Sequence, residues 1–379
     1  MILESINYQR KFKNNQWQMM SAKNEGTPVV LSNINLVVGK NASGKSNTIS
    51  VVDTLADLLA GLHTPMDLVY DTASFDVKFR NIDDTYRYVV EFKNGTIIKE
   101  ELYKNGEELI NRKKGKIYYQ SLNNYVDFKT DDDVLAVTRR DSIQHPYLNP
   151  LNEWGKQLRC YRFGTPMGKN VWVRDLSQIK DVDAKNTDRV VALYIQGRKK
   201  STTFSNVIVN DMRRLNYDIS KIEAMELKRD DMKERIGMAV SENGLKDYTD
   251  QIEMSSGMFR ALSLVVQLEY AILLDEPSCI LIDDIGEGLD YERSTELIKL
   301  VIEKAENSKV QIIMTTNDRF VMNNVPLKYW QVVARGEKGV CFYNQFNSQE
   351  SFEDFKYTGL NNFDFFASKF YNKIIGKEK

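Results

Sequence analysis

The 379-residue chain has few of the residues on which metal and disulfide frameworks depend. It contains two histidines, His63 and His145, which are too few for a histidine-rich metal centre. Its three cysteines are odd in number and far apart in sequence, at Cys160, Cys279 and Cys341, and they match no zinc template. We therefore exclude a histidine-rich metal site and expect a protein of a reducing compartment.

The chain also lacks a long apolar run, a strong net charge and a secretion signal. Its longest apolar-rich stretch, residues 261–274, is interrupted by Gln267 and Glu269 and falls short of the ~18 apolar residues that a membrane span requires. The formal net charge of −1 does not indicate nucleic-acid binding. The first residues, Met-Ile-Leu-Glu, show no basic and then apolar pattern. We expect a cytoplasmic protein with no membrane partner.

A phosphate-binding loop is the most informative feature that the chain does contain. The octapeptide GKNASGKS, from Gly39 to Ser46, fits the template G-x-x-x-x-G-K-[ST]. In this template backbone N–H groups cradle the phosphates, Lys45 reaches the β- and γ-phosphates, and the Ser46 hydroxyl can ligate Mg²⁺. A strand is expected over residues 29–38, and its apolar end at 35–38 precedes the loop. Apolar residues follow the loop at helical spacing over 46–62. The helix N-terminus would point at the phosphates, so the sequence predicts nucleotide binding.

A second motif is MSSGM at residues 254–258, which contains Ser255, Ser256 and Gly257. At the start of a helix these residues offer a hydroxyl, N–H groups and the positive end of the helix dipole to a γ-phosphate. A simple helix N-cap is the plainer interpretation, and the three residues satisfy it equally well.

Two acidic segments compete for the role of magnesium-binding strand end. In CILIDDIGEGLD, residues 279–290, an apolar strand leads to Asp283, which would hold the Mg²⁺ shell. The alternative is LLDEP at residues 273–277, which we interpret as the polar end of a helix that Pro277 stops.

Together these motifs resemble those of ABC-type ATPases. MSSGM resembles the LSGGQ signature, Leu289-Asp290 resembles the D-loop, and MTTND at residues 314–318 ends where the switch residue lies in that superfamily. The extended loop GxNxSGKSN resembles the branch that contains RecF, SMC and OLD (overcoming-lysogenisation-defect) proteins, as does the opening strand with Asn7-Tyr8. Stand-alone OLD-like ATPases of this kind resemble those of bacterial anti-phage systems.

The resemblance implies a site shared between two copies of the chain, which sandwich ATP and Mg²⁺ face to face. Asp283 and Ser46 would hold the metal, while Asp284 and Asn317 would be the catalytic residues. The family usually has glutamate and often histidine at these two catalytic positions, so the resemblance implies slow turnover. The residues expected to contact ATP are Gly39, Asn41, Ser43, Gly44, Lys45, Ser46, Asn47, Ser255, Ser256, Gly257 and Asp290.

The order of motifs predicts an α/β fold, an ABC-type P-loop ATPase head with a mixed or parallel core sheet, an antiparallel β lobe and a helical lobe. Asn-Gly pairs between β-rich segments favour an antiparallel meander, and a helical pattern covers about 175–215. The predicted parts are a nucleotide-binding core (1–65 and 275–346), a β lobe (66–130), a helical and signature lobe (131–274) and an aromatic-rich tail (347–379).

The chain shows no coiled coil and no room for the nuclease domain that OLD nucleases carry, so we expect catalytic output from a separate effector protein such as a nuclease. The tail is dense in aromatic residues, which either bind a partner or pack on the core. Basic clusters at 112–116, 198–200 and 213–214 leave DNA contact open. The alternatives to an ATP-driven switch are a RecF-like DNA-binding repair ATPase and an ATP-bound scaffold with negligible hydrolysis.

Overall fold

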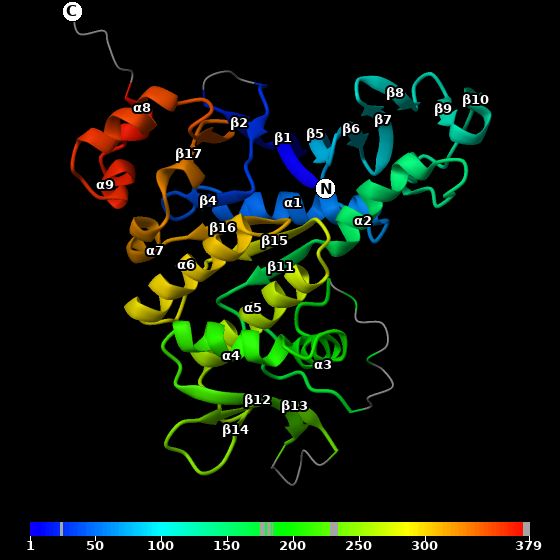
Figure 1. Cartoon of the computed structure of the whole chain (residues 1–379). Helices are drawn as coiled ribbons and strands as arrows, with labels where there is room; N and C mark the ends of the chain where they lie inside the picture. The colour runs from blue at the N-terminus through cyan, green and yellow to red at the C-terminus, as the bar shows by residue number, and fades with distance from the viewer. Residues whose placement is uncertain (23–25, 175–178, 180–182, 184, 228–233, 374–379) are drawn as a thin grey trace, which may run out of the picture. The chain divides into compact units, whose positions relative to one another are not determined.

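The computed structural model describes the chain apart from residues 23–25, 175–178, 180–182, 184, 228–233 and 374–379 (Figure 1). The described residues form a mixed α/β fold with a large sheet of parallel and antiparallel strands, which confirms the predicted fold class. The chain divides into two compact units. Unit 1 comprises residues 1–158, 277–279 and 326–379, and unit 2 comprises residues 159–276 and 280–325.

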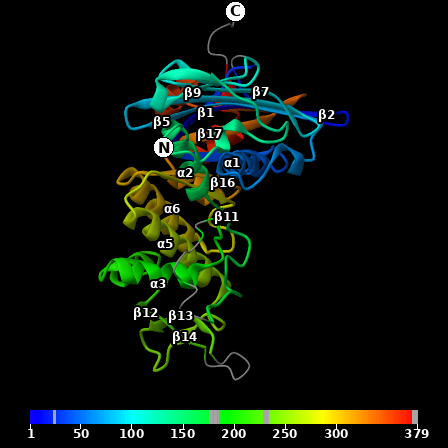
Figure 2. The same cartoon turned by 90° about the vertical axis from the view of Figure 1, so that its right-hand side faces the viewer.

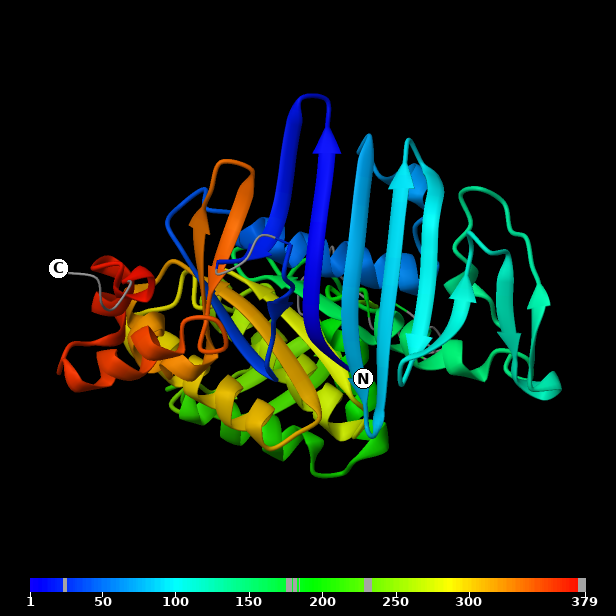
Figure 3. The same cartoon turned by 90° about the horizontal axis from the view of Figure 1, so that it is seen from above.

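Unit 1 is built on strands in the order β10-β9-β8-β7-β6-β5-β1-β2-β18-β17-β4, with β3 beside β1. Neighbours are antiparallel from β10 to β2, whereas β18 runs parallel to β2 and β17 runs parallel to β4. The long blue and cyan strands lie side by side in Figure 3. The strands are β1 (Ile2–Phe12), β2 (Asn15–Ser21), β3 (Val29–Val30), β4 (Ile34–Val38), β5 (Thr72–Asn81), β6 (Asp84–Lys93), β7 (Thr96–Lys104), β8 (Glu107–Asn111), β9 (Lys116–Tyr119), β10 (Asn124–Asp127), β17 (Trp330–Arg335) and β18 (Gly339–Tyr343). The helices are α1 (Lys45–Ala60), α2 (Asn149–Gln157), α8 (Gln349–Asp354) and α9 (Asn362–Ala367).

Helix α1 lies across one face of the unit 1 strands and is held there by α2 (Figures 1 and 3). A Cβ atom on Gly155 of α2 would lie 2.5 Å from the carbonyl oxygen of Ala56, so the two helices meet at backbone distance. The Asn152 side chain donates a hydrogen bond of 3.1 Å to the carbonyl of Leu59. Gly61 ends α1 in the left-handed conformation, at φ 73°. These contacts fix the direction of α1 and therefore the position of its N-terminus.

In unit 2, helices lie between a parallel strand pair and a small antiparallel sheet (Figures 1 and 2). Strand β11 is parallel to β15, and β12, β13 and β14 form the three-stranded sheet. The strands are β11 (Arg159–Arg162), β12 (Ile219–Glu226), β13 (Ile236–Glu242), β14 (Thr249–Asp250), β15 (Ser278–Asp283, of which 280–283 belong to this unit) and β16 (Val310–Thr316). The helices are α3 (Val190–Lys200), α4 (Phe204–Arg214), α5 (Ser256–Leu273), α6 (Tyr291–Glu306) and α7 (Arg319–Asn324).

Helix α5 forms the core of unit 2. By length and composition it could cross a membrane, but 72% of it is buried inside the protein, as in a core helix. Its buried Glu269 pairs with Lys304 of α6 at 2.8 Å, and the same ammonium pairs with Asp211 of α4 at 3.0 Å. Burial raises the pKa of Glu269. This charged triad joins three helices around the segment that carries the predicted signature.

The structure differs from the predicted elements near the N-terminus. The single strand expected over residues 29–38 is two strands, β3 and β4. They are separated by a turn in which the Ser32 amide donates to Asn35 Oδ1 at 2.9 Å. Asn35 is buried, and its side chain hydrogen-bonds within the turn. The spacing of apolar residues alone does not predict such a turn.

The region from 131 to 274, predicted as a helical and signature lobe, also contains β11 and the three-stranded sheet. The helix expected over about 175–215 is two helices, α3 and α4, separated by residues 201–203. The part of that expectation at 175–178, 180–182 and 184 lies outside the described residues. Of the expected core segments, 1–65 lies in unit 1, and 275–346 contributes residues to both units.

Candidate functional site

The predicted phosphate loop leaves the end of β4 and leads directly into α1, as its sequence requires. A Cβ atom on Gly39 would lie 2.4 Å from Ser43 Oγ and 2.7 Å from the carbonyl oxygen of Val333. Gly44 has φ 106°, and a Cβ there would lie 2.7 Å from a methyl carbon of Val340. Both glycines are therefore needed, the second for its conformation as well as for space.

Lys45 turns its side chain back into the loop. Its ammonium donates to the carbonyl oxygens of Gly39 at 2.9 Å and Lys40 at 3.2 Å, and the residue is only 6% exposed. The Ser43 hydroxyl is buried and has no hydrogen-bond partner among the described residues. Helix α1 has no acidic residue in its first turn and no side-chain cap. A phosphate would supply the missing partner of Ser43 and accept from the helix N-terminus, so the residues present fit a nucleotide phosphate chain.

The remaining loop residues predicted to contact ATP lie at the surface. Asn41, Ser46 and Asn47 are all exposed, two of them in the first turn of α1. The structure thus brings all seven predicted loop residues together at the start of one helix, with their polar groups divided between a buried set and an exposed set.

Trp17 is a neighbour of this loop that sequence reasoning missed. A Cβ on Gly44 would lie 3.6 Å from the Trp17 ring. The Arg10 guanidinium carbon lies 5.1 Å from the centre of the Trp17 ring and 4.7 Å from that of the Tyr70 ring. A flat, half-buried ring beside a phosphate loop offers a stacking surface for a nucleobase. No local pattern marks Trp17, because only the placement of β2 brings it to the loop.

In unit 2 a buried hydroxyl organises the predicted acidic pair. Thr315, at the end of β16, donates to Asp283 Oδ1 at 2.5 Å and accepts from the backbone N–H of Asp284 at 2.8 Å. The carbonyl of Thr315 accepts from the Ile285 amide at 2.9 Å. Asp284 itself lies in the left-handed region at φ 54°, an uncommon conformation for aspartate that is found at functional turns. Thr315 is a further residue that sequence reasoning missed.

A cavity of about 310 Å³ opens beside this turn. Asn317 donates from Nδ2 to Asp284 Oδ1 at 3.2 Å, so the two predicted catalytic residues touch. A carboxylate held by an amide can orient a water molecule for attack. The amide donates a hydrogen bond but cannot transfer a proton as a general acid. The cavity is lined by Asp284, Ile285, Glu287, Thr316, Asn317 and Asp318.

The predicted signature lies at the N-terminus of α5, where Ser255 is the N-cap. Its hydroxyl accepts from the Met258 amide at 3.1 Å, which is the plain capping role. Ser255 and Ser256 are nevertheless exposed. A Cβ on Gly257 would lie 3.2 Å from Leu289 Cδ2, so glycine permits close approach of the predicted D-loop. The structure therefore places the signature and the D-loop against each other.

Asp290 caps α6 at the end of this D-loop. Its carboxylate accepts from the Arg293 amide at 2.9 Å and pairs with the Arg293 guanidinium at 2.7 Å. The backbone hydrogen bond from Arg293, together with the side-chain contact, lowers the pKa of Asp290. Arg293 in turn lies over the ring of Tyr217, 4.4 Å from its centre. Asp290 is thus an exposed, ionised group in a fixed orientation.

The competing acidic motif does not end a strand. Asp275 follows the end of α5 in a turn, at φ 52°, and pairs with Lys309 at 2.8 Å. Strand β15 starts at Ser278 and ends at Asp283.

The aromatic tail packs mainly on its own unit. Phe352, Phe355 and Phe365 are buried, and the Phe365 ring lies 6.3 Å from the ring of Trp330 on β17. Tyr357 is 90% exposed. Core packing therefore accounts for the buried aromatics, and it leaves few of the tail rings at the surface.

The arginines of the three basic clusters have protein partners. Arg112 pairs with the buried Glu100, Arg198 with Glu223 and Arg214 with Glu303, while Arg213 donates to a backbone carbonyl. These contacts satisfy the charges within the fold and do not indicate a groove for DNA. Among the described residues no group of three or more His, Cys, Asp or Glu side chains is arranged to hold a metal ion.

Comparison with known proteins places the fold. No protein-family description and no curated protein matches the sequence. The structure is similar to an SmcHead bound to the C-winged helix domain of ScpA, with TM-score 0.56 and 14% identity, covering 90% of this chain and 97% of that one. It is also similar to an Smc head domain with an extended coiled coil bound to the C-terminal domain of ScpA derived from Pyrococcus furiosus, with TM-score 0.52, 14% identity and coverages of 94% and 99%. The fold is that of an SMC head.

Proposed function

We propose that this chain is an ABC-type ATPase that binds ATP with Mg²⁺, hydrolyses it slowly and closes as a homodimer around it. The phosphate loop is the observation that carries the proposal. Its two glycines leave no room for side chains, Lys45 is held inside it, and no described residue hydrogen-bonds the Ser43 hydroxyl. The SMC-head fold supports the same conclusion, since it suggests an ATP-binding ABC-type ATPase.

The proposed ligands of Mg²⁺ are the Ser46 hydroxyl and the Asp283 carboxylate. Magnesium is a hard cation that takes one or two protein oxygens and keeps water and phosphate as its other ligands, so two donors suffice. When bound, Mg²⁺ would supply positive charge against the phosphates. The role of Thr315 is to fix one oxygen of Asp283 by its 2.5 Å hydrogen bond.

Asp284 is the proposed residue that orients the attacking water, and Asn317 positions Asp284. Aspartate is one methylene shorter than the glutamate usual in the family, so water placement is less favourable. Asn317 stands where the family often has histidine, and its amide donates to Asp284 but cannot transfer a proton as histidine can. Both features support slow turnover, which suits a switch better than a motor.

The signature residues are proposed to bind the γ-phosphate held by a second copy of the chain. Ser255 and Ser256 are exposed at the start of an 18-residue helix, where backbone N–H groups and the helix dipole favour an anion. Asp290 is exposed in the adjoining loop. ATP would then contribute contacts that exist only in the closed dimer, so its binding would shift the equilibrium toward closure.

The output of this switch is proposed to be control of a separate effector protein such as a nuclease, in the manner of stand-alone OLD-like ATPases of anti-phage defence. Support comes from the sequence resemblance, and from the two similar structures, each an Smc head bound to part of ScpA. A RecF-like DNA-binding role has no supporting contact in the basic clusters. Measurement of phosphate release distinguishes an ATP-bound scaffold from a switch that hydrolyses ATP.

The experiment compares Asp284→Asn with Asp275→Asn, which removes the same charge from the competing acidic motif. With ATP, we expect light scattering to show Asp284→Asn at twice the monomer mass, and phosphate release to fall at least ~10-fold. Asp275→Asn should behave as the parent chain. An unchanged mass for Asp284→Asn with ATP would contradict the sandwich. Phosphate release at background in the parent chain, unaltered by Asp284→Asn, would favour the scaffold.

A further inference from the structure

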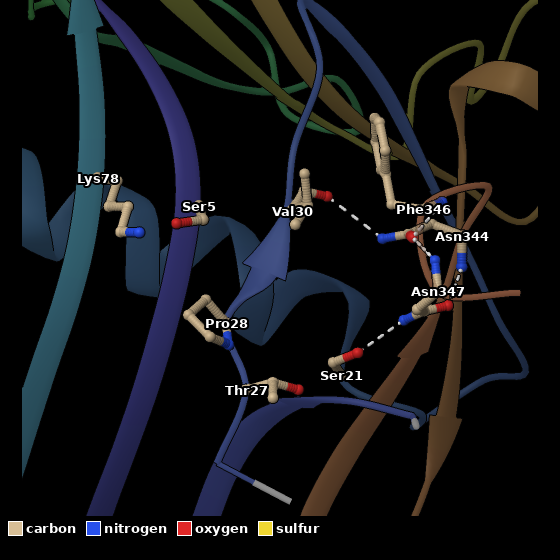
Figure 4. A pocket seen from close by; sticks show the side chains of 9 residues that line it. All are labelled: Ser5, Ser21, Thr27, Pro28, Val30, Lys78, Asn344, Phe346 and Asn347. Atoms are coloured by element: carbon tan, nitrogen blue, oxygen red, sulfur yellow. Dashed lines mark hydrogen bonds between the residues drawn. The ribbon is translucent and has the colours of Figure 1, made fainter. Parts of the chain in front are cut away.

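A hollow of about 420 Å³ lies on unit 1, in residues that the nucleotide site does not use (Figure 4). Its floor is a row across three strands: Ser5 of β1 is paired with Lys78 of β5 on one side and with Val30 of β3 on the other. Directly opposed residues of antiparallel strands project from the same face, so these three side chains line one surface. The volume is within the range of small-molecule sites.

One wall of the hollow is a turn that its own hydrogen bonds hold rigid. Asn344, after β18, donates to the carbonyl of Val30 at 3.2 Å and to Gln331 Oε1 at 2.9 Å, and its own Oδ1 accepts from two backbone amides. Asn347 donates to Ser21 Oγ at 2.9 Å and to the carbonyl of Phe342 at 2.7 Å. The wall therefore exists before any ligand arrives, which lowers the cost of binding.

An ammonium and a hydroxyl lie next to each other at one end of the hollow. Lys78 makes no ion pair within the described part of the chain, and Figure 4 shows its ammonium pointing toward Ser5, which is only 7% exposed. Ser21 lies across the hollow, where its oxygen accepts from Asn347 (Figure 4). Among the described residues that line the hollow there is no carboxylate. One ammonium beside one hydroxyl favours an anionic ligand at this end.

An aromatic ring lies on the other side of the hollow. Phe346 is 52% exposed, and it lies across from Lys78 with Val30 between them (Figure 4). An exposed phenyl ring at the edge of a preformed hollow is a stacking surface for a planar group.

We propose that this hollow is a second ligand site, which binds a small organic anion with a flat ring system. The anionic group, a phosphate or a carboxylate, accepts from Lys78 and Ser5, and the ring lies on Val30 and Phe346. The ligand can bind in one orientation only, because its anionic group needs the end with Lys78 and its ring needs the end with Phe346. The inference does not depend on the function proposed for the phosphate loop.

The test is calorimetric titration of the Lys45→Ala chain, in which we expect nucleotide binding at the predicted phosphate loop to be weakened ~100-fold or more. AMP probes a phosphate on a ring, 1-naphthoate a carboxylate on a ring, and inorganic phosphate and adenosine probe the two halves. We expect AMP or 1-naphthoate to bind with Kd below ~1 mM, and each half to bind at least ~10-fold more weakly.

Two substitutions in the hollow and one control outside it show whether the hollow is responsible. Lys78→Glu should weaken binding at least ~10-fold, and Phe346→Ala by several-fold, whereas Lys93→Glu, an exposed lysine on the neighbouring strand β6, should leave it unchanged. The proposal is overturned if neither anion binds, or if Lys78→Glu and Lys93→Glu bind the anion equally well. Loss of binding in both lysine variants would likewise overturn it, because the net charge of the protein, and not the position of Lys78, would then control anion binding.

Discussion

The phosphate loop and the acidic turn after β15 present opposite chemistry and are built in opposite ways. The loop gathers donors, an ammonium and backbone N–H groups, and holds them through two glycines five positions apart in sequence. The turn presents carboxylates, and holds them through Thr315, a residue of a different strand. A single short sequence motif can therefore encode the donor site, which consists largely of backbone groups. The acceptor site consists of side chains from two strands, so it forms only when the fold brings those strands together.

The largest expected effect is on the donor side. Lys45→Ala should weaken ATP binding ~100-fold or more, because it removes charge-assisted hydrogen bonds to phosphate that no nearby group replaces. Competition titration with a fluorescent ATP analogue measures it. Lys40→Ala is the matched control, since it changes an exposed lysine of the same loop and keeps the carbonyl that Lys45 contacts. Equal affinities for the two variants would show that the loop is not the phosphate site.

An intermediate effect is expected on the acceptor side. Thr315→Val removes the hydrogen bonds to Asp283 and to the Asp284 amide, and should lower the free energy of unfolding by ~1–3 kcal/mol. Phosphate release should fall with it, since the acidic pair loses its anchor. Denaturant unfolding and a phosphate assay give both values, and Thr315→Ser should restore each of them. A valine variant as active and stable as the serine variant would mean that the hydroxyl is dispensable.

The smallest expected effect concerns the ring beside the donor site. Trp17→Ala should weaken ATP binding about tenfold by removing a base-stacking surface, and Trp17→Phe should retain most of it. Inorganic triphosphate, which has no base, should bind both variants equally in the same titration. Equal losses for ATP and triphosphate would instead indicate that Trp17 supports the loop itself, through its contact with Gly44.

The sequence supports prediction best where function depends on consecutive residues. The loop, its preceding strand and following helix, and the strand that ends at Asp283 all agree with the structure, because each is a local pattern of glycines or apolar spacing. Thr315 and Trp17 have no such pattern, and their positions follow from strand placement. The three-stranded sheet of unit 2 was missed because β12 and β13 lie in a region where helical spacing dominates on either side.

The contact between Gly155 and the backbone of Ala56 means that a substitution outside the loop can displace the loop's helix. A valine at 155 would push α1 outward along its length while leaving each candidate ligand-binding side chain chemically intact. Such a variant would separate the presence of the candidate nucleotide-binding groups from their alignment.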